Sequence, residues 1–341
     1  MFETQIITAY PEEKLEKEWL EFLGRANYPS HYTSPGFFLM PHWDDRRPFA
    51  VIVREENKIA AVACGIFPGQ KIEIGLAVRP QVAFDPSCED AQLAASLFEG
   101  VTSQAGSSPE LITLYSMERI PGLVELGFAE RKSTAGDRVV VIDLLAGIDS
   151  VFKGLSSSRR ANIRKAKKRR LVDVFELQER EDLEELHPVH KEWCRNKGIA
   201  PDSPDRFRRS WENKENVKIF AARHEGKIVA GSTFRFVKGG IVEYSGNVST
   251  PESRSLRPND LLMWTALEWA AGSGFKKFSM GASHPFLQRF GGTIESSWRY
   301  RMDRSIFRRH DIAEGLREAV RKAYMSMPEG ARSKLKSMLG R

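Results

Sequence analysis

The sequence predicts an α/β protein in which one αβ unit occurs twice and a strongly basic helix joins the two copies. Two segments share Arg, Glu, Lys, Ile and Ala at one fixed offset: AVIVREENKIAA over 50–61 and IFAARHEGKIVA over 219–230. The chain has 341 residues, of which 41% are apolar, so it is long enough for two domains with a core each. Between the copies, Arg159 to Arg170 contains eight basic residues and no acidic residue.

Each repeat has the pattern of a β-hairpin: an apolar strand, a polar turn with Asn57 or Gly226, and a second apolar strand. The elements that follow are parallel as well. Copy one continues with a strand over 72–78, a helix over 91–104, a strand over 111–116, a short helix ending at 126–128 and a strand over 138–144. Copy two continues with a strand over 241–248, a helix over 259–271, a strand over 276–280, a short helix ending at 290–292 and a strand over 297–302.

The remaining helices lie between the copies and after them. Serines at 156–158 are expected to cap the basic helix, whose narrow apolar stripe is Leu155, Ile163 and Ala166. Residues 181–196 predict another helix, which Pro188 should bend or begin. We therefore divide the chain into a first domain (1–150) on the acceptor side, a basic helical linker with the start of domain two (151–215), a second and active domain (216–305), and a basic C-terminal helical tail (306–341).

Basic charge is concentrated in two places. Of the net charge of +7, Arg159 to Arg170 contributes +8 and Arg299 to Arg341 contributes +7, so the rest of the chain carries −8. Local basicity indicates an anionic partner: the phosphates of a ligand, a transfer RNA or, for the C-terminal tail, an anionic membrane surface. The chain lacks the roughly 18 consecutive apolar residues of a membrane-spanning helix, and we expect it to be soluble and cytoplasmic.

Several classes of site have no support in the sequence. Cys64, Cys88 and Cys194 form neither a disulfide framework nor a metal-binding pair. His187 and His190 have metal-ligand spacing but no third ligand, so we expect no metal. The motifs GxSxG, GxxxxGK[ST] and GxGxxG are absent, which excludes the common serine hydrolase, P-loop and dinucleotide-binding signatures.

Several short segments, in order, carry a resemblance. They are SPGFF (34–38), RRANIRKA (159–166), NKG (196–198), GKIVAG (226–231), LLMW (261–264), GFKKFSMG (274–281) and FGG (290–292). Together they resemble the Fem-type (FemAB-like) branch of tandem GNAT acyltransferases and peptidyltransferases, near its polysaccharide-associated members. The resemblance implies two GNAT-like domains, each a twisted mixed sheet flanked by helices. It also implies aminolysis of a thioester or ester.

The donor remains open between two classes. The GNAT pyrophosphate loop should fall at 254–259 (RSLRPN), where its glycines are missing, and copy one has the acidic DPSCED at 85–90. Without glycines the backbone N–H groups approach phosphates less closely. The co-substrate is therefore either acyl-CoA or aminoacyl-tRNA, with no tightly bound cofactor and with copy two as the active half.

Candidate site residues follow from the chemistry and the resemblance. Glu243 is the candidate base and Tyr244 the candidate acid, on opposite faces of one strand, with His284 as an alternative base. Arg257, Asn259 and Asp260 stand at the start of the central helix, where Arg257 suits a donor phosphate and Asp260 suits a cap. In the linker helix, we expect the phosphates of the acceptor or of a tRNA to bind Arg159, Arg160, Arg164 and Lys165.

The function predicted from these residues is transfer of an acyl or aminoacyl group to an amine of a sugar-type or peptide-type acceptor, which could be nucleotide-linked or lipid-linked. A narrower version is an acetyl-CoA-dependent N-acetyltransferase that acts on an amino sugar. The alternative from another class is a non-catalytic RNA-binding or phosphate-binding protein built on degenerate GNAT folds. Because Arg159 to Arg170 contains no aromatic residue, phosphate contact is favoured over base stacking.

Overall fold

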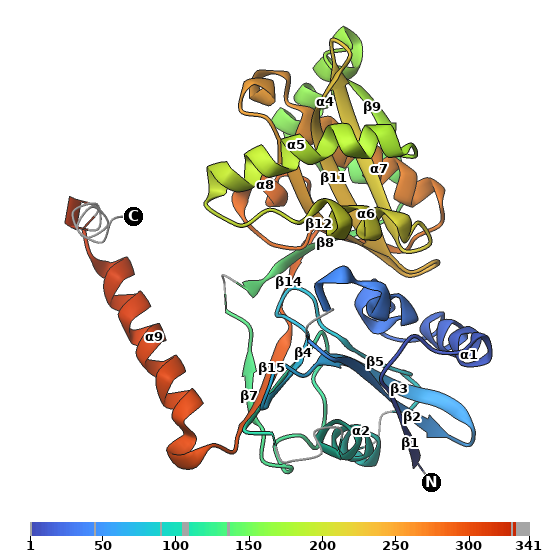
Figure 1. Cartoon of the computed structure of the whole chain (residues 1–341), viewed down its shortest axis with the longest axis vertical. Helices are drawn as coiled ribbons and strands as arrows, with labels where there is room; N and C mark the ends of the chain where they lie inside the picture. Colours follow the sequence, from blue (N-terminus) through green and yellow to red (C-terminus); the bar gives the residue numbers. More distant parts are fainter. Residues whose placement is uncertain are drawn as a thin grey trace.

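The computed structural model describes residues 2–43, 46–88, 91–103, 109–134, 137–328 and 330–331. These residues form two lobes, each built on one mixed sheet with helices against it, and the two lobes lie end to end (Figure 1). The predicted α/β class with two similar units is confirmed. No helix in the described ranges combines the length and the apolar content needed to cross a bilayer.

The first sheet has the order β1-β2-β3-β4-β6-β15-β7, with β5 paired to β3. Its strands are β1 (Phe2–Ile7), β2 (Pro48–Glu55), β3 (Lys58–Ile66), β4 (Lys71–Ile74), β5 (Val82–Phe84), β6 (Leu111–Ser116), β7 (Ala129–Lys132) and β15 (Trp298–Asp303). Helices α1 (Glu13–Leu23) and α2 (Ala91–Ser103) pack on this lobe. Three short 3-10 helices, His31–Thr33, Pro35–Leu39 and Pro41–Trp43, carry the chain toward the second lobe.

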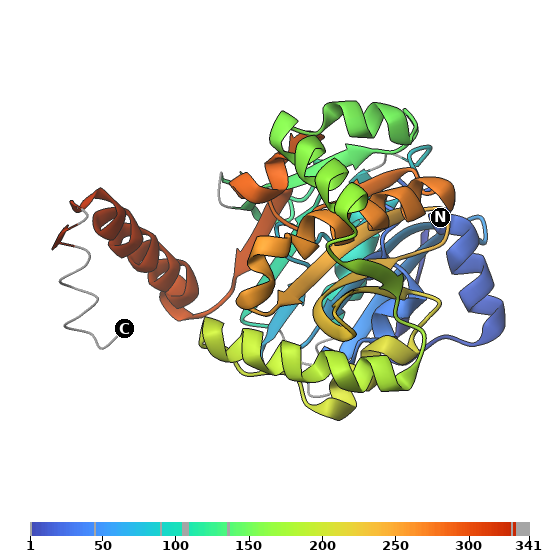
Figure 2. The ribbon, with the colours of Figure 1, turned by 90° about the horizontal axis from the view of Figure 1, so that it is seen from above.

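The second sheet has the order β14-β8-β13-β12-β11-β10-β9. Its strands are β8 (Val139–Asp143), β9 (Asp173–Glu176), β10 (Val217–His224), β11 (Lys227–Phe236), β12 (Ile241–Ser249), β13 (Lys277–Ser279) and β14 (Thr293–Glu295). Its helices are α3 (Ile148–Gly154), α4 (Ser157–Arg169), α5 (Arg180–Lys197), α6 (Pro204–Glu212), α7 (Pro258–Gly272) and α8 (Pro285–Gln288). Helix α9 (Arg309–Ser326) follows β15 and projects outward from the first lobe (Figures 1 and 2).

The two repeated hairpins have the same backbone geometry. Glu56 and Asn57 have φ of 47° and 67°, and Glu225 and Gly226 have φ of 49° and 80°. Two consecutive positive φ values are typical of the turn whose twist matches a hairpin. Each hairpin also has one extra residue on its second strand: Ala60 lies opposite the step from Val53 to Arg54, and Val229 lies opposite the step from Ala222 to Arg223. The duplication inferred from the sequence therefore extends to local irregularities of the strands.

The two lobes exchange a strand, which corrects the predicted domain boundaries. We expected the strand over 138–144 to complete the first sheet, but β8 lies in the second sheet between β13 and β14. Conversely, β15 lies in the first sheet between β6 and β7. In Figure 1 the green β8 sits in the upper lobe and the orange β15 in the lower one. The pattern of apolar residues in a strand indicates that the strand is buried, but it does not identify the neighbouring strands. The sequences of β8 and β15 are therefore compatible with either sheet.

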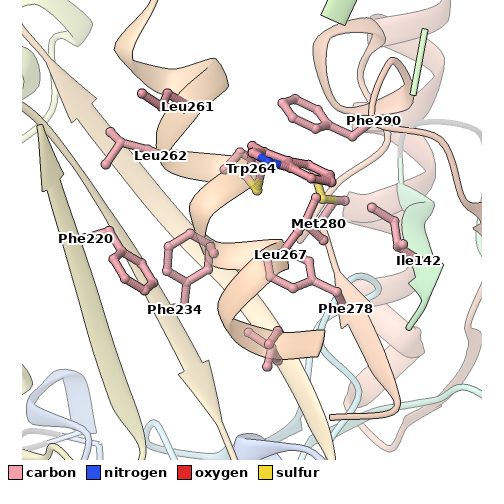
Figure 3. Packing of buried hydrophobic residues seen from close by; sticks show 14 of the residues in the cluster. Ile142, Phe220, Phe234, Leu261, Leu262, Trp264, Leu267, Phe278, Met280 and Phe290 are labelled. Atoms are coloured by element: carbon pink, nitrogen blue, oxygen red, sulfur yellow. The ribbon is translucent and has the colours of Figure 1, made fainter. Parts of the chain in front are cut away.

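The side chains of the two exchanged strands are buried in the cores of the lobes whose sheets they join. Ile142 of β8 packs in the core of the second lobe with Phe234, Trp264 and Met280, as Figure 3 shows. Tyr300 of β15 is fully buried in the core of the first lobe, where its hydroxyl accepts a hydrogen bond from the backbone N–H of Ile120 at 2.8 Å. The core of each lobe therefore contains residues from the other half of the sequence.

Three helical segments differ in detail from their predictions. The linker helix is present as α4, with a Ser156 cap and with Leu155, Ile163 and Ala166 buried, as expected. Helix α5 passes through Pro188 without ending. Residues 121–127 form successive turns instead of a short helix, which suits a segment with Pro121, Gly122 and Gly127. The predicted C-terminal tail continues into residues 332–341, which lie outside the described residues.

We predict that Tyr300→Phe destabilises the protein by about 1–3 kcal/mol, because the buried N–H of Ile120 loses its acceptor. Tyr115→Phe on the adjacent β6 is the matched control, since the Tyr115 hydroxyl has no hydrogen-bond partner in the described part of the chain. Chemical denaturation of both variants measures the difference. Equal stability of the two variants would contradict the role of β15 as a core strand of the first lobe.

Candidate functional site

The parallel pairing between β12 and β13 ends early. It joins Ile241 to Lys277, Val242 to Phe278 and Glu243 to Ser279, and no further pair follows. On its other edge, β12 stays paired with β11 as far as Ser249. From Tyr244 onward, one edge of β12 therefore has no neighbouring strand.

A bulge lies directly after the last of these pairs. Thr233 pairs with Gly246 and Phe234 with Tyr244, so Ser245 is the extra residue on β12. An arginine from each lobe holds it. Arg79 of the first lobe donates to the Ser245 carbonyl at 3.1 Å, and Arg235 of β11 donates to its hydroxyl at 2.8 Å. The bulge is thus fixed at the junction of the two lobes.

A cavity of about 600 Å³ opens onto this bulge between the lobes. The first lobe contributes Tyr32, His42, Trp43 and Arg46 among others, and the second contributes residues of α5, α6, β11 and β12, including Ser245 and Asn247. The charged groups that line the cavity are Arg46, Glu73, Arg79, Asp202, Arg206 and Arg235. Four arginines against two acids make this interlobe cavity suited to an anionic ligand.

Two histidines line the cavity beside one carboxylate. His42 Nε2 lies 3.7 Å from Asp202 Oδ1, and His190 Nε2 accepts a hydrogen bond from the Asp202 backbone N–H at 3.0 Å. Burial, together with the charge of Arg235, lowers the pKa of His42, although Asp202 acts in the opposite direction. Burial also lowers the pKa of His190. Both rings are therefore neutral near pH 7, and His42 Nδ1 is buried without a partner in the described part of the chain.

Helix α7 and the interlobe cavity lie on opposite faces of the second sheet. Phe220, Phe234 and Val242 point to the core that α4 and α7 cover. Ile219 points to the other face, where it packs with α5 and also lines the cavity. Because successive strand residues alternate between faces, the unpaired edge of β12 beyond Glu243 borders both faces of the sheet.

Comparison with known proteins identifies the fold. Residues 157–293 match the family model described as an acetyltransferase (GNAT) domain. No curated protein sequence matches the chain. Among solved structures, FemX is similar with a TM-score of 0.70 at 12% identity, over 88% of this chain and 98% of FemX.

The chain has a Fem-like tandem GNAT fold.

Two further solved structures agree with this assignment. L-PGS from Bacillus licheniformis has a TM-score of 0.56 at 15% identity, over 88% of this chain and 95% of L-PGS. A tandem GNAT protein from the clavulanic acid biosynthesis pathway has a TM-score of 0.55 at 11% identity, over 89% and 99% of the two chains. The predicted resemblance is therefore confirmed for the fold. The domain match supports acyl transfer as the general class of function.

Within the tandem GNAT fold, Glu243 lies beneath the interlobe cavity and does not line it. Its side chain is 1% exposed, and Tyr28 donates to its Oε1 at 3.4 Å. Burial raises its pKa to about 8, although Arg79 and Arg235 partly offset this shift. Glu243 is therefore mostly protonated at pH 7, which makes it a poor direct base for a ligand in the cavity.

Neither Tyr244 nor His284 lines the interlobe cavity. The Tyr244 ring packs on Phe234 in the α7 core, so it faces away from Glu243 as predicted. Its hydroxyl donates to Asn247 Oδ1 at 2.6 Å, and burial raises its pKa. His284 is exposed at the N-cap of α8 and does not line the cavity.

The residues predicted at the start of α7 are tied to α4. Asp260 is buried, forms an ion pair with Arg159 and accepts a hydrogen bond from Asn162 Nδ2 at 2.7 Å. It joins the two helices and makes no cap hydrogen bond. Arg257 is exposed and donates to the Asn162 side chain. Asn259 Oδ1 is buried with no partner among the described residues.

The predicted phosphate-binding residues of α4 divide into two groups. Arg159 is buried over the ring of Phe286 at 4.0 Å, and Arg160 donates to the carbonyls of Lys153 and Leu155. Arg164 and Lys165 are exposed. Because α4 covers the face opposite the cavity, the structure brings none of these four residues into it.

Sequence reasoning missed the residues that line the interlobe cavity. His42 follows the SPGFF segment, and Asp202 follows the NKG segment, but about 160 residues separate them. Arg79 and Arg235 come from two further segments. Only the tertiary fold brings these four side chains together.

We predict that wild-type stability falls relative to Glu243→Gln as pH rises. The pKa of Glu243 is raised on folding from 4.5 to about 8, so its contribution is fully present below about 4.5 and is lost as pH rises through about 8. Unfolding free energies of both proteins between pH 5 and 9 should diverge by about 1–4 kcal/mol. A difference that stays constant over this range would contradict a buried, protonated Glu243.

Proposed function

We propose that this chain is an N-acyltransferase that joins an acyl or aminoacyl donor on the α4 and α7 face to an amine-bearing anionic acceptor in the interlobe cavity. The observation that carries the proposal is the end of β12–β13 pairing at Glu243 and Ser279. The gap beyond this pair connects the two faces. A donor carbonyl in the gap would be reachable by an amine from the cavity.

The acceptor class follows from the cavity. Arg46, Arg79, Arg206 and Arg235 favour a ligand with phosphate or carboxylate groups. Trp43 and Trp193 offer flat apolar surfaces on which a sugar ring can pack. A volume of about 600 Å³ suits a sugar or short peptide unit. We infer an anionic amino sugar or peptide acceptor, and a nucleotide-linked or lipid-linked form meets the same requirements.

His42 is the proposed base. Its neutral imidazole takes a proton from the acceptor ammonium, and the neighbouring Asp202 carboxylate stabilises the imidazolium that forms. The free amine then attacks the carbonyl carbon of the donor. Glu243, protonated and buried, acts behind the cavity as a positioning residue for the Tyr28 segment.

Reaction of the amine gives a tetrahedral intermediate. Backbone N–H groups on the free edge of β12 are suited to bind its oxyanion. Collapse breaks the bond to the donor oxygen or sulfur, which must leave with a proton, while the attacking nitrogen gives up one proton to the conjugate base of the acid, so that a neutral amide forms. Tyr244, on the α7 face beside Asn247, is the proposed acid for this leaving group.

The donor proposed here is an aminoacyl-tRNA in preference to an acyl-CoA. The start of α7 lacks the glycines of a pyrophosphate loop, and Asp260 adds a buried carboxylate there. The neighbouring α4 and its C-cap expose five basic residues, none of which pairs with a described acidic residue: Arg164, Lys165, Lys168, Arg169 and Arg170. A continuous basic face suits a polyanion longer than coenzyme A.

We predict that His42→Gln lowers the transfer rate by about 10²–10⁴-fold with unchanged thermal stability. In wild type, the rate should fall with acidification as His42 becomes protonated, and this acid limb should disappear in the variant. Steady-state transfer from charged tRNA to amino-sugar and peptide acceptors measures both effects. Normal turnover in His42→Gln, with a loss in Glu243→Gln, would move the base to Glu243.

We predict that Arg164→Gln/Lys165→Gln weakens charged tRNA binding by about tenfold at moderate salt and makes binding less salt-dependent. Lys14→Gln/Lys17→Gln on α1 is the matched control, since both lysines are exposed and lie on the other lobe. Filter binding with charged tRNA, and separately with acetyl-CoA, measures donor affinity. Unchanged tRNA affinity, or saturable binding of acetyl-CoA alone, would contradict the proposed donor. Binding without any transfer would favour the non-catalytic alternative.

A further inference from the structure

Helix α9 carries a continuous apolar stripe that faces no part of either lobe. Ile312, Leu316 and Val320 are spaced four residues apart and are 56%, 63% and 69% exposed. The preceding turn adds two more exposed apolar side chains, Ile306 and Phe307. Figures 1 and 2 show α9 projecting to one side of the molecule in both views. Leaving such a stripe in water is costly unless another surface covers it.

The acidic residues of α9 all lie on the opposite side of the helix. At about 100° per residue, Asp311, Glu314 and Glu318 cluster on the face turned away from the stripe. Each is paired with an arginine of the first sheet: Asp311 with Arg301 at 2.5 Å, Glu314 with Arg301 at 2.7 Å and with Arg299, and Glu318 with Arg131 at 2.9 Å. These ion pairs fix the rotation of α9 about its axis, so the apolar stripe points outward.

Basic residues border the stripe. Arg317 and Lys322 fall about 110° to either side of Leu316 by the same spacing, and both are exposed with no described acidic partner. The sequence from 327 to 341 adds Arg332, Lys334, Lys336 and Arg341 against one acid, Glu329. An apolar stripe flanked by long cationic side chains is the pattern of a helix that lies in the plane of a membrane surface.

We propose that α9 is an anchor that lays its Ile312, Leu316 and Val320 stripe on an anionic lipid surface. Arg317 and Lys322 reach the lipid phosphates, and the acidic face stays bound to the first lobe. A second copy of the chain is a poorer occupant. Its α9 would bring further arginine and lysine to the stripe, while every described acidic residue of α9 is already paired.

Vesicle co-sedimentation of the full chain tests the anchor. We expect binding to vesicles of phosphatidylcholine mixed with phosphatidylglycerol in equal parts, weaker binding to phosphatidylcholine alone, and weaker binding at high salt. Leu316→Gln/Val320→Gln should lower the bound fraction by about tenfold. Arg317→Gln/Lys322→Gln should reduce binding to the anionic vesicles only. Leu145→Gln, which changes a 74% exposed leucine near α3, should bind as wild type does.

Two results would overturn the proposal. One is wild-type protein that ignores anionic vesicles, or a Leu316→Gln/Val320→Gln variant that binds them as well as wild type does while keeping its circular dichroism and melting temperature. The other is a wild-type dimer, seen by size-exclusion chromatography with light scattering, that this variant converts to a monomer. That outcome would make the stripe a contact between copies of the chain. Neither result depends on whether the chain transfers an acyl group.

Discussion

The parallel pairing of β12 with β13 ends at Glu243 and Ser279, and the bulge of β12 and the interlobe cavity both lie next to this end point. Just beyond β13, the chain at Gly281 still passes close to β12, and glycine permits this approach because it has φ of 67° and a Cβ there would lie 2.5 Å from the Tyr244 carbonyl oxygen. The bulge at Ser245 then bends the free edge of β12, and Arg79 and Arg235 fix the bend from both lobes. The free edge of β12 is therefore held by the same arginines that contribute positive charge to the cavity.

The buried Glu243 fits this arrangement electrostatically. Burial raises the pKa of the Glu243 carboxyl group, whereas the positive charges of Arg79 and Arg235 lower it. When this carboxyl group releases its proton, its negative charge balances part of the charge of the two arginines. The same two arginines face the cavity, where an anionic acceptor would compete for them. The protonation state of Glu243 and the occupancy of the cavity are thus expected to be linked.

Local patterns in the sequence were sufficient for the parts of the fold that local forces determine. The two hairpins and the α4 stripe follow from turn chemistry and helical spacing, and the structure confirms both. Arg159 lies on that stripe, between Leu155 and Ile163, so its burial could have been inferred from the helical spacing. Its position among eight basic residues instead suggested an exposed phosphate-binding side chain. His42 and Asp202 could not have been paired from the sequence, because neither has a local signature and their contact depends on how the lobes dock. Strand partners were missed for the same reason.

The exchange of β8 and β15 has a consequence for synthesis of the chain on the ribosome. The first lobe cannot complete its sheet when its own 132 residues have emerged, because β15 separates β6 from β7 and ends only at Asp303. Until then, one edge of β6 is unpaired and the core of the first lobe lacks the Tyr300 side chain. Chaperones or other nascent chains can bind this exposed edge. In a protein with two copies of one unit, the first lobe therefore cannot fold independently of the second copy, and its sheet can be completed only after Asp303 has emerged.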